Sequence, residues 1–369
     1  MRRSYTKSVK GRSNSERPEI WSRSDPARRE TGDLDESWNR GKRHMAKSRR
    51  PGTLKRRVFL VGGGAAAVAA CAGSGGKDRA VSPVRAEAAY PALGRVFRIG
   101  AHDVHATDEG RGGRPVVLIH GANVNLRDWT HALSGRLARS RRTIAVDRPG
   151  FGYSTRDDGD WTPSRQAAQL RKAVAEMGVE RPIVVGHSWG ASVALAWSLD
   201  APESVAGVVS VSGATMPWGV AADIAAALGI GRWATDLYMS RLARRAEDGA
   251  IEDFVARAFR PQIPPDGYLD YVGAPLSLRR ASMDANAADL AALHPALAEQ
   301  ARRYKGMRAP VEIVHGARDW LLNVEQHAVG LANALPSGQA RVTVAPGVGH
   351  MAHHARLDLV ERAIERLDA

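Results

Sequence analysis

Beyond residue 90, short apolar runs alternate with segments whose apolar residues recur every three or four positions. The short runs have the length of strands buried on both faces, and the longer segments have the period of helices. One helix is predicted to begin after Thr162, a capping residue followed by proline at the first helical position. The predicted strands cover residues 95–99, 115–119, 143–146, 182–185, 208–211, 310–314 and 341–344. This alternation predicts an α/β fold, a mostly parallel sheet with helices on both faces.

The alternation stops between residues 215 and 308. This stretch is rich in Ala, Leu, Met and Arg, and it holds no run that resembles a strand. We expect a helical cap, inserted into a core formed by residues 91–214 and 309–369. Each of its aromatic side chains is expected to pack in the core or between cap and core, and together they are candidates to cover an apolar pocket; they include Trp218, Trp233, Tyr238, Phe259 and Tyr268.

The formal net charge of +14 is concentrated near the beginning of the chain. Residues 1–57 hold 18 Lys or Arg and 7 Asp or Glu, a net charge of +11. The rest of the chain is close to neutral, which excludes a catalytic domain that binds nucleic acid. Residues 1–44 have too few aliphatic side chains to form a core. We expect them to be a disordered basic extension, or an artefact of a translation start at Met45.

Residues 45–71 have the layout of a bacterial export signal. Basic residues precede an apolar run, 58–70, that is too short to span a bilayer as a mature helix. Arg56 and Arg57 resemble a twin-arginine signal, although Lys55 stands where Ser or Thr is usual. We therefore expect export of the folded protein by the twin-arginine route.

Cys71 is the only cysteine, so no intramolecular disulfide is possible. The preceding residues, Val68-Ala69-Ala70, make this site resemble a bacterial lipobox. Lipidation of Cys71 would anchor the protein at the cell membrane, with residues 72–90 as a flexible tether. The alternative is an ordinary signal peptide cut after Ala88, which would release a soluble secreted or periplasmic protein.

The strongest chemical signal is the motif Gly186-His187-Ser188-Trp189-Gly190, between a predicted strand and a predicted helix. A turn that joins a strand directly to a helix is sharp, and side chains two positions from the serine would clash there. Glycine at both positions removes this clash. We expect Ser188 to stand exposed as a nucleophile, whereas the alternative is a tight turn of small residues without chemistry.

A neutral serine is a poor nucleophile, so it needs a base and an acid that orients the base. His350 lies in a glycine-rich turn after the last predicted strand, and Asp319 lies in the loop after the preceding strand. Sites in open α/β sheets form at these carboxyl ends of strands. The chain order Ser188, Asp319, His350 is the order expected for a triad on such a sheet. His353 and His354 are weaker candidates for the base, because we expect them to begin the closing helix.

The charge that develops on a substrate carbonyl oxygen needs hydrogen-bond donors placed in advance. One expected donor is the backbone N–H of Trp189, which directly follows the nucleophile. The other is the backbone N–H of Ala122, in the loop after the strand at 115–119, where Gly121 permits a turn.

With these pieces in place, the chain resembles the α/β-hydrolase-fold serine hydrolases over about residues 95–369. The matching motifs are His120-Gly121, residues 147–154, residues 186–190, residues 316–319 and Gly349-His350. The resemblance implies a sheet of about eight strands with a cap after the sixth, and a triad of Ser188, His350 and Asp319. It implies neither a cofactor nor a metal.

Trp189 also resembles the residue after the nucleophile in epoxide hydrolases and haloalkane dehalogenases, but those enzymes carry aspartate where this chain has Ser188. Their alkyl-enzyme chemistry is therefore excluded. The expected reaction is hydrolysis of a carboxylic ester or lactone of a small to medium apolar molecule through an acyl-enzyme. Cofactor-free perhydrolysis and cleavage of an activated carbon–carbon bond on the same triad are alternatives. A further alternative is a binding lipoprotein that has kept the fold without turnover.

Overall fold

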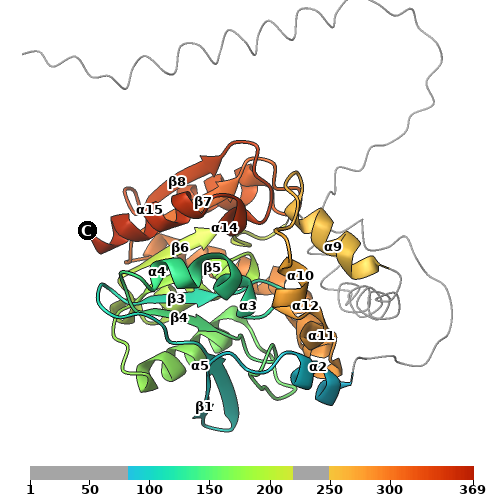
Figure 1. The fold of residues 1–369 in the computed structure, drawn as a ribbon. Helices are drawn as coiled ribbons and strands as arrows, with labels where there is room; N and C mark the ends of the chain where they lie inside the picture. Colours follow the sequence, from blue (N-terminus) through green and yellow to red (C-terminus); the bar gives the residue numbers. More distant parts are fainter. Residues whose placement is uncertain (1–81, 219–248) are drawn as a thin grey trace, which may run out of the picture. The chain divides into compact units, whose positions relative to one another are not determined.

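The computed structural model describes residues 82–218 and 249–369, which are built around one eight-stranded sheet (Figure 1). The strand order is β1-β2-β4-β3-β5-β6-β7-β8. Strand β2 pairs antiparallel with β1 and β4, and the remaining neighbours are parallel. The strands are β1 (Arg95–Ile99), β2 (His102–Ala106), β3 (Val116–Ile119), β4 (Thr143–Val146), β5 (Ile183–His187), β6 (Gly207–Val211), β7 (Val311–Gly316) and β8 (Ala340–Ala345). The predicted fold class, a mostly parallel sheet in an α/β arrangement, is confirmed.

The seven strands predicted from apolar runs are all present, with ends within two residues of the expected ones. The pattern misses β2, whose sequence His102-Asp103-Val104-His105-Ala106 is mostly polar. Its polar side chains are accommodated by partners inside the fold. The buried ring of His105, for example, lies with Nδ1 2.6 Å from Oδ2 of the buried Asp147.

Alternate residues of the central strands point to opposite faces of the sheet. In β3, Val117 and Ile119 pack with helices α5 (Pro163–Glu176) and α6 (Trp189–Asp200). Val116 and Leu118 pack instead with side chains of α3 (Arg127–Trp129) and α15 (Leu357–Asp368). Helices therefore cover both faces, and because the central strands are buried throughout they read as continuous apolar runs.

The segment between β6 and β7 is helical in its described part. It contains α9 (Ala250–Phe259), α10 (Tyr268–Val272), α11 (Ala274–Ser277) and α12 (Arg280–Arg303). Residues 219–248, which include Trp233 and Tyr238, lie outside the described residues. The shorter described helices are η3 (Thr130–Ser134), α4 (Gly135–Leu137), η4 (Pro202–Ser204), η6 (Tyr304–Gly306), η7 (Glu325–Val329), α13 (Gly330–Ala334) and α14 (Ala352–Ala355).

Residues 83–89 belong to the segment expected to be a flexible tether, but they form a helix, α2 (Pro83–Ala89), beside α11 (Figure 1). Ala86 is buried, and the Glu87 carboxylate forms an ion pair of 2.6 Å with Arg279. The hydroxyl of Tyr153 donates to the carbonyl of Tyr90 at 2.6 Å. This end of the segment is thus fixed to the fold by burial and polar contacts.

The remaining expectations for the beginning of the chain fall on residues 1–81, outside the described residues. They concern the extension 1–44, the export signal 45–71 with Cys71, and the tether from residue 72. Among the described helices, none is both long and apolar enough to cross a membrane.

Candidate active site

Ser188 occupies the sharp turn between β5 and α6. Its φ of 51° lies in the left-handed region that non-glycine residues rarely adopt. A β-carbon on Gly186 would overlap the carbonyl group of Gly190, and one on Gly190 would overlap the carbonyl group of Ile119. Glycine is therefore needed at both positions, for the steric reason expected from the sequence. Backbone strain of this kind is concentrated at functional positions.

The loop that follows β3 lies against this turn. A β-carbon on Gly121 would lie 3.2 Å from Cβ of Ser188. Ala122 comes next, and Asn123 has a positive φ of 61°. The N–H of Trp189 lies in the first turn of α6, where N–H groups have no partner within the helix. The two expected oxyanion donors, Ala122 and Trp189, thus belong to backbone segments that meet at Ser188.

Asp319 follows β7, and His350 lies in the turn after β8. Nδ1 of His350 lies 2.8 Å from Oδ2 of Asp319. The other carboxylate oxygen, Oδ1, accepts the N–H groups of Leu321 and Leu322 at 2.9 and 3.0 Å. Burial raises the pKa of Asp319, but the neighbouring His350 and His315 outweigh burial and hold this pKa below its ordinary value. An ionised Asp319 keeps the proton of His350 on Nδ1 and leaves Nε2 available for chemistry.

The structure assigns no direct hydrogen bond between Oγ of Ser188 and His350 among the described residues. The two residues are connected instead through His187. Nε2 of His187 lies 3.2 Å from the carbonyl oxygen of His350, and the centres of the two rings are 4.9 Å apart. A nucleophile and its base often form their hydrogen bond only when substrate binds.

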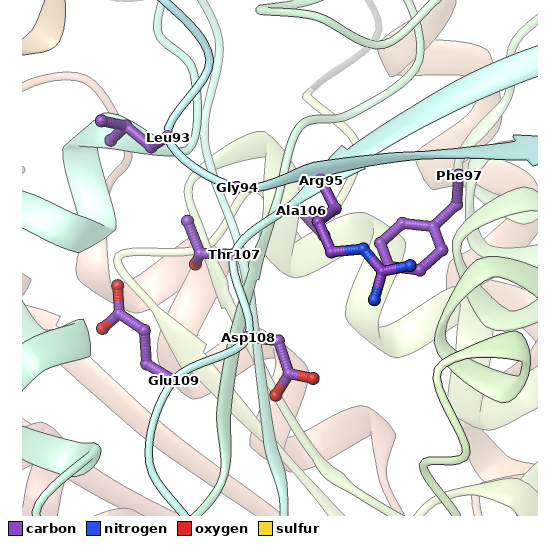
Figure 2. Close-up of a pocket in the computed structure, with 8 residues that line it drawn as sticks. All are labelled: Leu93, Gly94, Arg95, Phe97, Ala106, Thr107, Asp108 and Glu109. Carbon is purple, nitrogen blue, oxygen red and sulfur yellow. The ribbon is translucent and has the colours of Figure 1, made fainter.

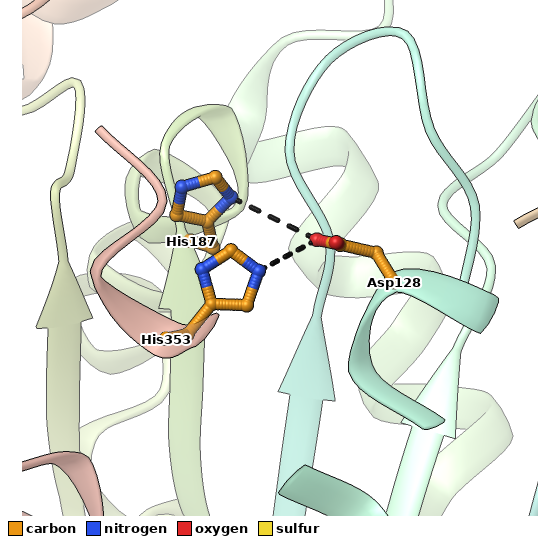
Figure 3. Close-up of side chains that lie close together, drawn as sticks. All are labelled: Asp128, His187 and His353. Carbon is orange, nitrogen blue, oxygen red and sulfur yellow. Dashed lines mark hydrogen bonds and ion pairs between the residues drawn. The ribbon is translucent and has the colours of Figure 1, made fainter. Parts of the chain in front are cut away.

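A buried cluster beside His187 was not identified in the sequence (Figure 3). Oδ2 of Asp128 lies 2.8 Å from Nε2 of His353, and Oδ1 lies 2.8 Å from both Nε2 of His354 and the hydroxyl group of Tyr268. Both alternative candidates for the base, His353 and His354, are thus engaged with Asp128. Their position after His350 was the only sequence signal for this cluster.

The protonation states in this cluster follow from burial and charge. Burial lowers the pKa of the His353 imidazole to about 4. Burial raises the pKa of Asp128, but His353 and His354 outweigh it, so the pKa of this carboxyl lies well below its ordinary value. Tyr268 is held in its protonated form, because burial and the neighbouring Asp128 raise its pKa well above the ordinary value. At neutral pH Asp128 is therefore a carboxylate that accepts hydrogen bonds from a neutral His353 and a protonated Tyr268.

Asp128, His187 and His353 each present one potential metal-ligand atom, and these atoms lie within 4.8 Å of one another. Imidazole and carboxylate ligands suit zinc in type. However, both oxygens of Asp128 already accept hydrogen bonds at 2.8 Å, and a metal would have to displace the donor on His353. The hydrogen bonds of Asp128 join α3, α10 and α14, while Nδ1 of His187 and Nδ1 of His353 are buried without a hydrogen-bond partner among the described residues.

Two cap aromatics that were candidates to cover a pocket have a packing role. Phe259 and Tyr268 are each 2 % exposed. Their rings contact each other at 4.9 Å and the ring of His354 at 5.2 and 5.0 Å. These side chains hold the cap helices on the core.

A surface pocket beside strands β1 and β2 contains none of the candidate catalytic or oxyanion-donor residues (Figure 2). The guanidinium group of Arg95 lies 5.1 Å from the centre of the Phe97 ring within it. Its lining consists of Leu93, Gly94, Arg95, Phe97, Ala106, Thr107, Asp108 and Glu109. We assign it no chemical role.

Comparison with solved structures supports the same architecture. An α/β hydrolase fold protein from Burkholderia ambifaria aligns with a TM-score of 0.60 and 23% identity, covering 74% of this chain and 97% of that one. A thermophilic esterase from Thermogutta terrifontis aligns with a TM-score of 0.59 and 18% identity, covering 75% of this chain and all of that one, 100%. At these identities the likeness concerns the fold alone.

Sequence comparison identifies curated relatives and a family. The 2-hydroxymuconate semialdehyde hydrolase of Pseudomonas putida is 31% identical over 141 residues, which make up 38% of this chain and 50% of that protein. The chain thus spans about half the length of this curated relative. Residues 114–356 match the family model described as the alpha/beta hydrolase fold. The chain belongs to the alpha/beta hydrolase fold family.

Proposed function

We propose that this chain is a serine hydrolase that cleaves a carboxylic ester or lactone of a small to medium apolar molecule. The observation that carries the proposal is the 2.8 Å hydrogen bond between His350 and Asp319, on loops that follow neighbouring strands of the sheet that also presents Ser188. A base oriented by a buried carboxylate, together with a serine on a strained turn, makes up the machinery of acyl transfer.

In the proposed reaction, Oγ of Ser188 attacks the carbonyl carbon of the substrate, and its proton passes to Nε2 of His350. The N–H groups of Ala122 and Trp189 stabilise the oxyanion, and the loss of one such donor typically costs about 3 to 4 kcal/mol. The alcohol leaves with the proton from His350. Water, deprotonated by His350, then attacks the acyl-enzyme, which releases the acid and restores Ser188.

A second candidate is hydrolysis of an activated carbon–carbon bond on the same residues. It is favoured by the Pseudomonas putida relative, whose name designates a hydrolase of 2-hydroxymuconate semialdehyde, a compound without an ester group. Cofactor-free perhydrolysis remains a third use of the triad. These reactions share the proposed nucleophile and base and differ in the substrate.

A fluorophosphonate probe and a set of p-nitrophenyl esters test the proposal together. We expect labelling of the wild-type protein and hydrolysis that is fastest for short and medium acyl chains. Ser188→Ala should abolish both, whereas Ser164→Ala, at a partly exposed position in the first turn of α5, should change neither. Hydrolysis of 2-hydroxymuconate semialdehyde without ester turnover would favour the second candidate. A folded protein that neither labels nor hydrolyses any of these compounds would overturn the enzyme proposal and favour a binding lipoprotein.

We also propose that the protein is exported by the twin-arginine route and anchored at the cell membrane by lipidation of Cys71. This proposal rests on the sequence of residues 45–71. The packing of α2 supports processing at Cys71 over cleavage after Ala88, because the latter would remove most of a helix whose Ala86 and Glu87 contact the fold.

A further inference from the structure

The side chain of Arg148, in the loop after β4, holds the carbonyl groups of the loop beside Ser188. Its Nε donates to the carbonyl of His120 at 3.1 Å, and one terminal nitrogen donates to the carbonyl of Gly121 at 3.0 Å. Arg148 is fully buried. Burial lowers its pKa to about 10, so it remains charged at neutral pH. A buried guanidinium presents donors in a rigid fork, which suits it to fixing several acceptors at once.

The ring of His120 also contacts the carbonyl of Gly121. The backbone N–H of Arg148 lies 3.0 Å from Nε2 of His120, and since an N–H only donates, this nitrogen accepts. The proton of the neutral ring is therefore on Nδ1, which donates to the carbonyl of Gly121 at 2.8 Å. Burial, followed by the charge of Arg148, lowers the pKa of His120 to about 4, in agreement with a neutral ring. Two donors thus converge on the oxygen of Gly121.

Fixing the carbonyl oxygen of Gly121 also fixes the N–H of Ala122, the oxyanion donor in the proposed reaction. The peptide bond between Gly121 and Ala122 is planar and trans, so the N–H of Ala122 points opposite to the carbonyl of Gly121. Rotation of this peptide would turn the N–H of Ala122 away from its direction and would break both hydrogen bonds to Gly121. Arg148 and His120 therefore determine where the N–H of Ala122 points.

The other end of Arg148 is tied to the cap. One terminal nitrogen lies 2.5 Å from Oδ2 of Asp289 on α12 and 2.9 Å from the side-chain oxygen of Gln166. Three residues earlier on α12, Oδ1 of Asn286 accepts the N–H of Asn123 at 3.0 Å. Residues three apart on a helix share a face. One face of α12 thus reaches the backbone on both sides of Ala122, directly at Asn123 and through Arg148 at Gly121.

We propose that Arg148 is a positioning residue that orients the N–H of Ala122 as an oxyanion donor, and that Asp289 and Asn286 make this orientation depend on the docking of α12. The inference rests on the proposed function, because the oxyanion hole is part of it. It adds that the cap of this chain completes the catalytic backbone. A displaced α12 would leave Ser188 and the Asp319–His350 pair in place but would remove its restraints on Arg148 and Asn123, and so loosen the peptide before Ala122.

The test compares Arg148→Lys with Arg156→Lys. Lysine retains the charge opposite Asp289, but its single ammonium group cannot reach Asp289 and the two loop carbonyls together. Arg156 is the matched control, because it also pairs with Asp289, at 2.6 Å, but donates to the carbonyl of Ala285 on α12 instead of to the loop beside Ser188. We expect Arg148→Lys to lower kcat by about 10- to 100-fold with KM changed less than about threefold, and Arg156→Lys to change both by less than about threefold.

Two further readouts separate positioning from a general structural role. A trifluoromethyl ketone forms an oxyanion on the serine, so its affinity should fall in parallel with kcat in Arg148→Lys and stay unchanged in Arg156→Lys. Amide hydrogen exchange of residues 119–125 should be faster in Arg148→Lys alone. If Arg148→Lys does not fold, Asn286→Ala provides the same test from the other side, with a smaller expected loss of about 3- to 10-fold in kcat.

A folded Arg148→Lys protein with kcat, inhibitor affinity and amide exchange like the wild type would overturn the proposal. Equal losses in Arg148→Lys and Arg156→Lys would also overturn it, because they would indicate a general effect of the Asp289 ion pairs. If the wild-type protein shows neither labelling nor hydrolysis, the proposed function fails and the catalytic part of the inference fails with it. Amide exchange would still report, without turnover, whether Arg148 fixes this peptide.

Discussion

Nδ1 of His350 lies 2.8 Å from Oδ2 of Asp319, a carboxylate whose side chain is wholly buried. The second oxygen of the same carboxylate is held by two backbone N–H groups, from Leu321 and Leu322. Asp319 therefore has a fixed orientation and accepts from His350 with one defined atom. Its position is suited to holding the imidazole of His350 in one tautomer.

Asp319→Asn should keep this geometry but favour the wrong tautomer of His350. We expect kcat for a p-nitrophenyl ester to fall by about 10³- to 10⁴-fold with little change in KM. Asp157→Asn is the control, since Asp157 also lies near a histidine, His102 at 3.6 Å, but on the surface. It should leave kcat unchanged. Near-normal turnover in a folded Asp319→Asn protein would contradict the assigned role of Asp319.

The two glycines of the turn that carries Ser188, Gly186 and Gly190, lead to a prediction about stability. A β-carbon on Gly190 would overlap the carbonyl groups of Ile119 and His120, and backbone on a central strand cannot move aside cheaply. Gly190→Ala should therefore lower the free energy of unfolding by at least about 3 kcal/mol, or prevent folding. Gly135→Ala is the control, because Gly135 has a helical φ of −64° and nothing within 4 Å of an added β-carbon. It should stabilise the protein by about 0.5 to 1 kcal/mol, as measured by urea unfolding. Similar midpoints for the two variants would contradict this account.

The sequence predicted most of the fold and the candidate triad, because both leave local signals. Strands buried on two faces are continuous apolar runs, and Ser188 lies between two glycines that its turn requires. Asp128 left no such signal, since its partners His353 and His354 are 225 and 226 residues away in the chain. Strand β2 was missed for a related reason, because its histidines are satisfied by tertiary contacts rather than by exposure.

The role of Arg148 could not be predicted from the sequence either, because it depends on a partner far away in the chain. Residues 147–154 could be recognised as a tight structural loop next to the site. The role of Arg148 depends on Asp289, which lies 141 positions away on α12. Only the folded chain brings the cap residue, the arginine and the carbonyl of Gly121 into one set of hydrogen bonds.

Acid should destabilise the fold through buried neutral histidines. Nδ1 of His327 faces the N–H groups of Thr215 and Met216 at 3.2 and 3.3 Å, so this nitrogen accepts and the ring is neutral in the folded protein. Burial lowers the pKa of His327 to about 4, whereas the unfolded chain has an ordinary value of about 6.5. Between these two values the unfolded state binds the extra proton, so the free energy of unfolding falls as the pH drops from about 6.5 to 4.

His327→Asn isolates this contribution, because the asparagine oxygen can accept the same N–H groups without titrating. The loss of unfolding free energy between pH 7.5 and pH 5 should be smaller in the variant by about 2 kcal/mol, as measured by urea unfolding at each pH. The comparison at pH 7.5 corrects for any change in packing. Identical pH profiles for the variant and the wild type would show that His327 does not titrate in this way. His120 should contribute to the loss of unfolding free energy in acid in both proteins, since burial also lowers its pKa to about 4.

The packing of α2 bears on how the chain is processed. Ala86 is 1 % exposed, and Glu87 pairs with Arg279 next to α12. A mature protein that began at residue 89 would lose both contacts, whereas one that began at Cys71 would keep them. We therefore expect mass spectrometry of the membrane fraction to find a mature chain that starts with acylated Cys71, and Cys71→Ser to release the protein from the membrane.

Glu87→Gln tests the structural half of this argument separately. Glu87 is partly exposed, with 43 % of its side chain accessible, so loss of its ion pair should cost no more than about 1 kcal/mol of unfolding free energy. Deletion of residues 83–89 should cost more, because it also removes the buried Ala86 and leaves Arg279 without its carboxylate. A soluble mature form that begins near residue 89 and is as stable as the longer chain would contradict both the membrane anchor and the role given to α2.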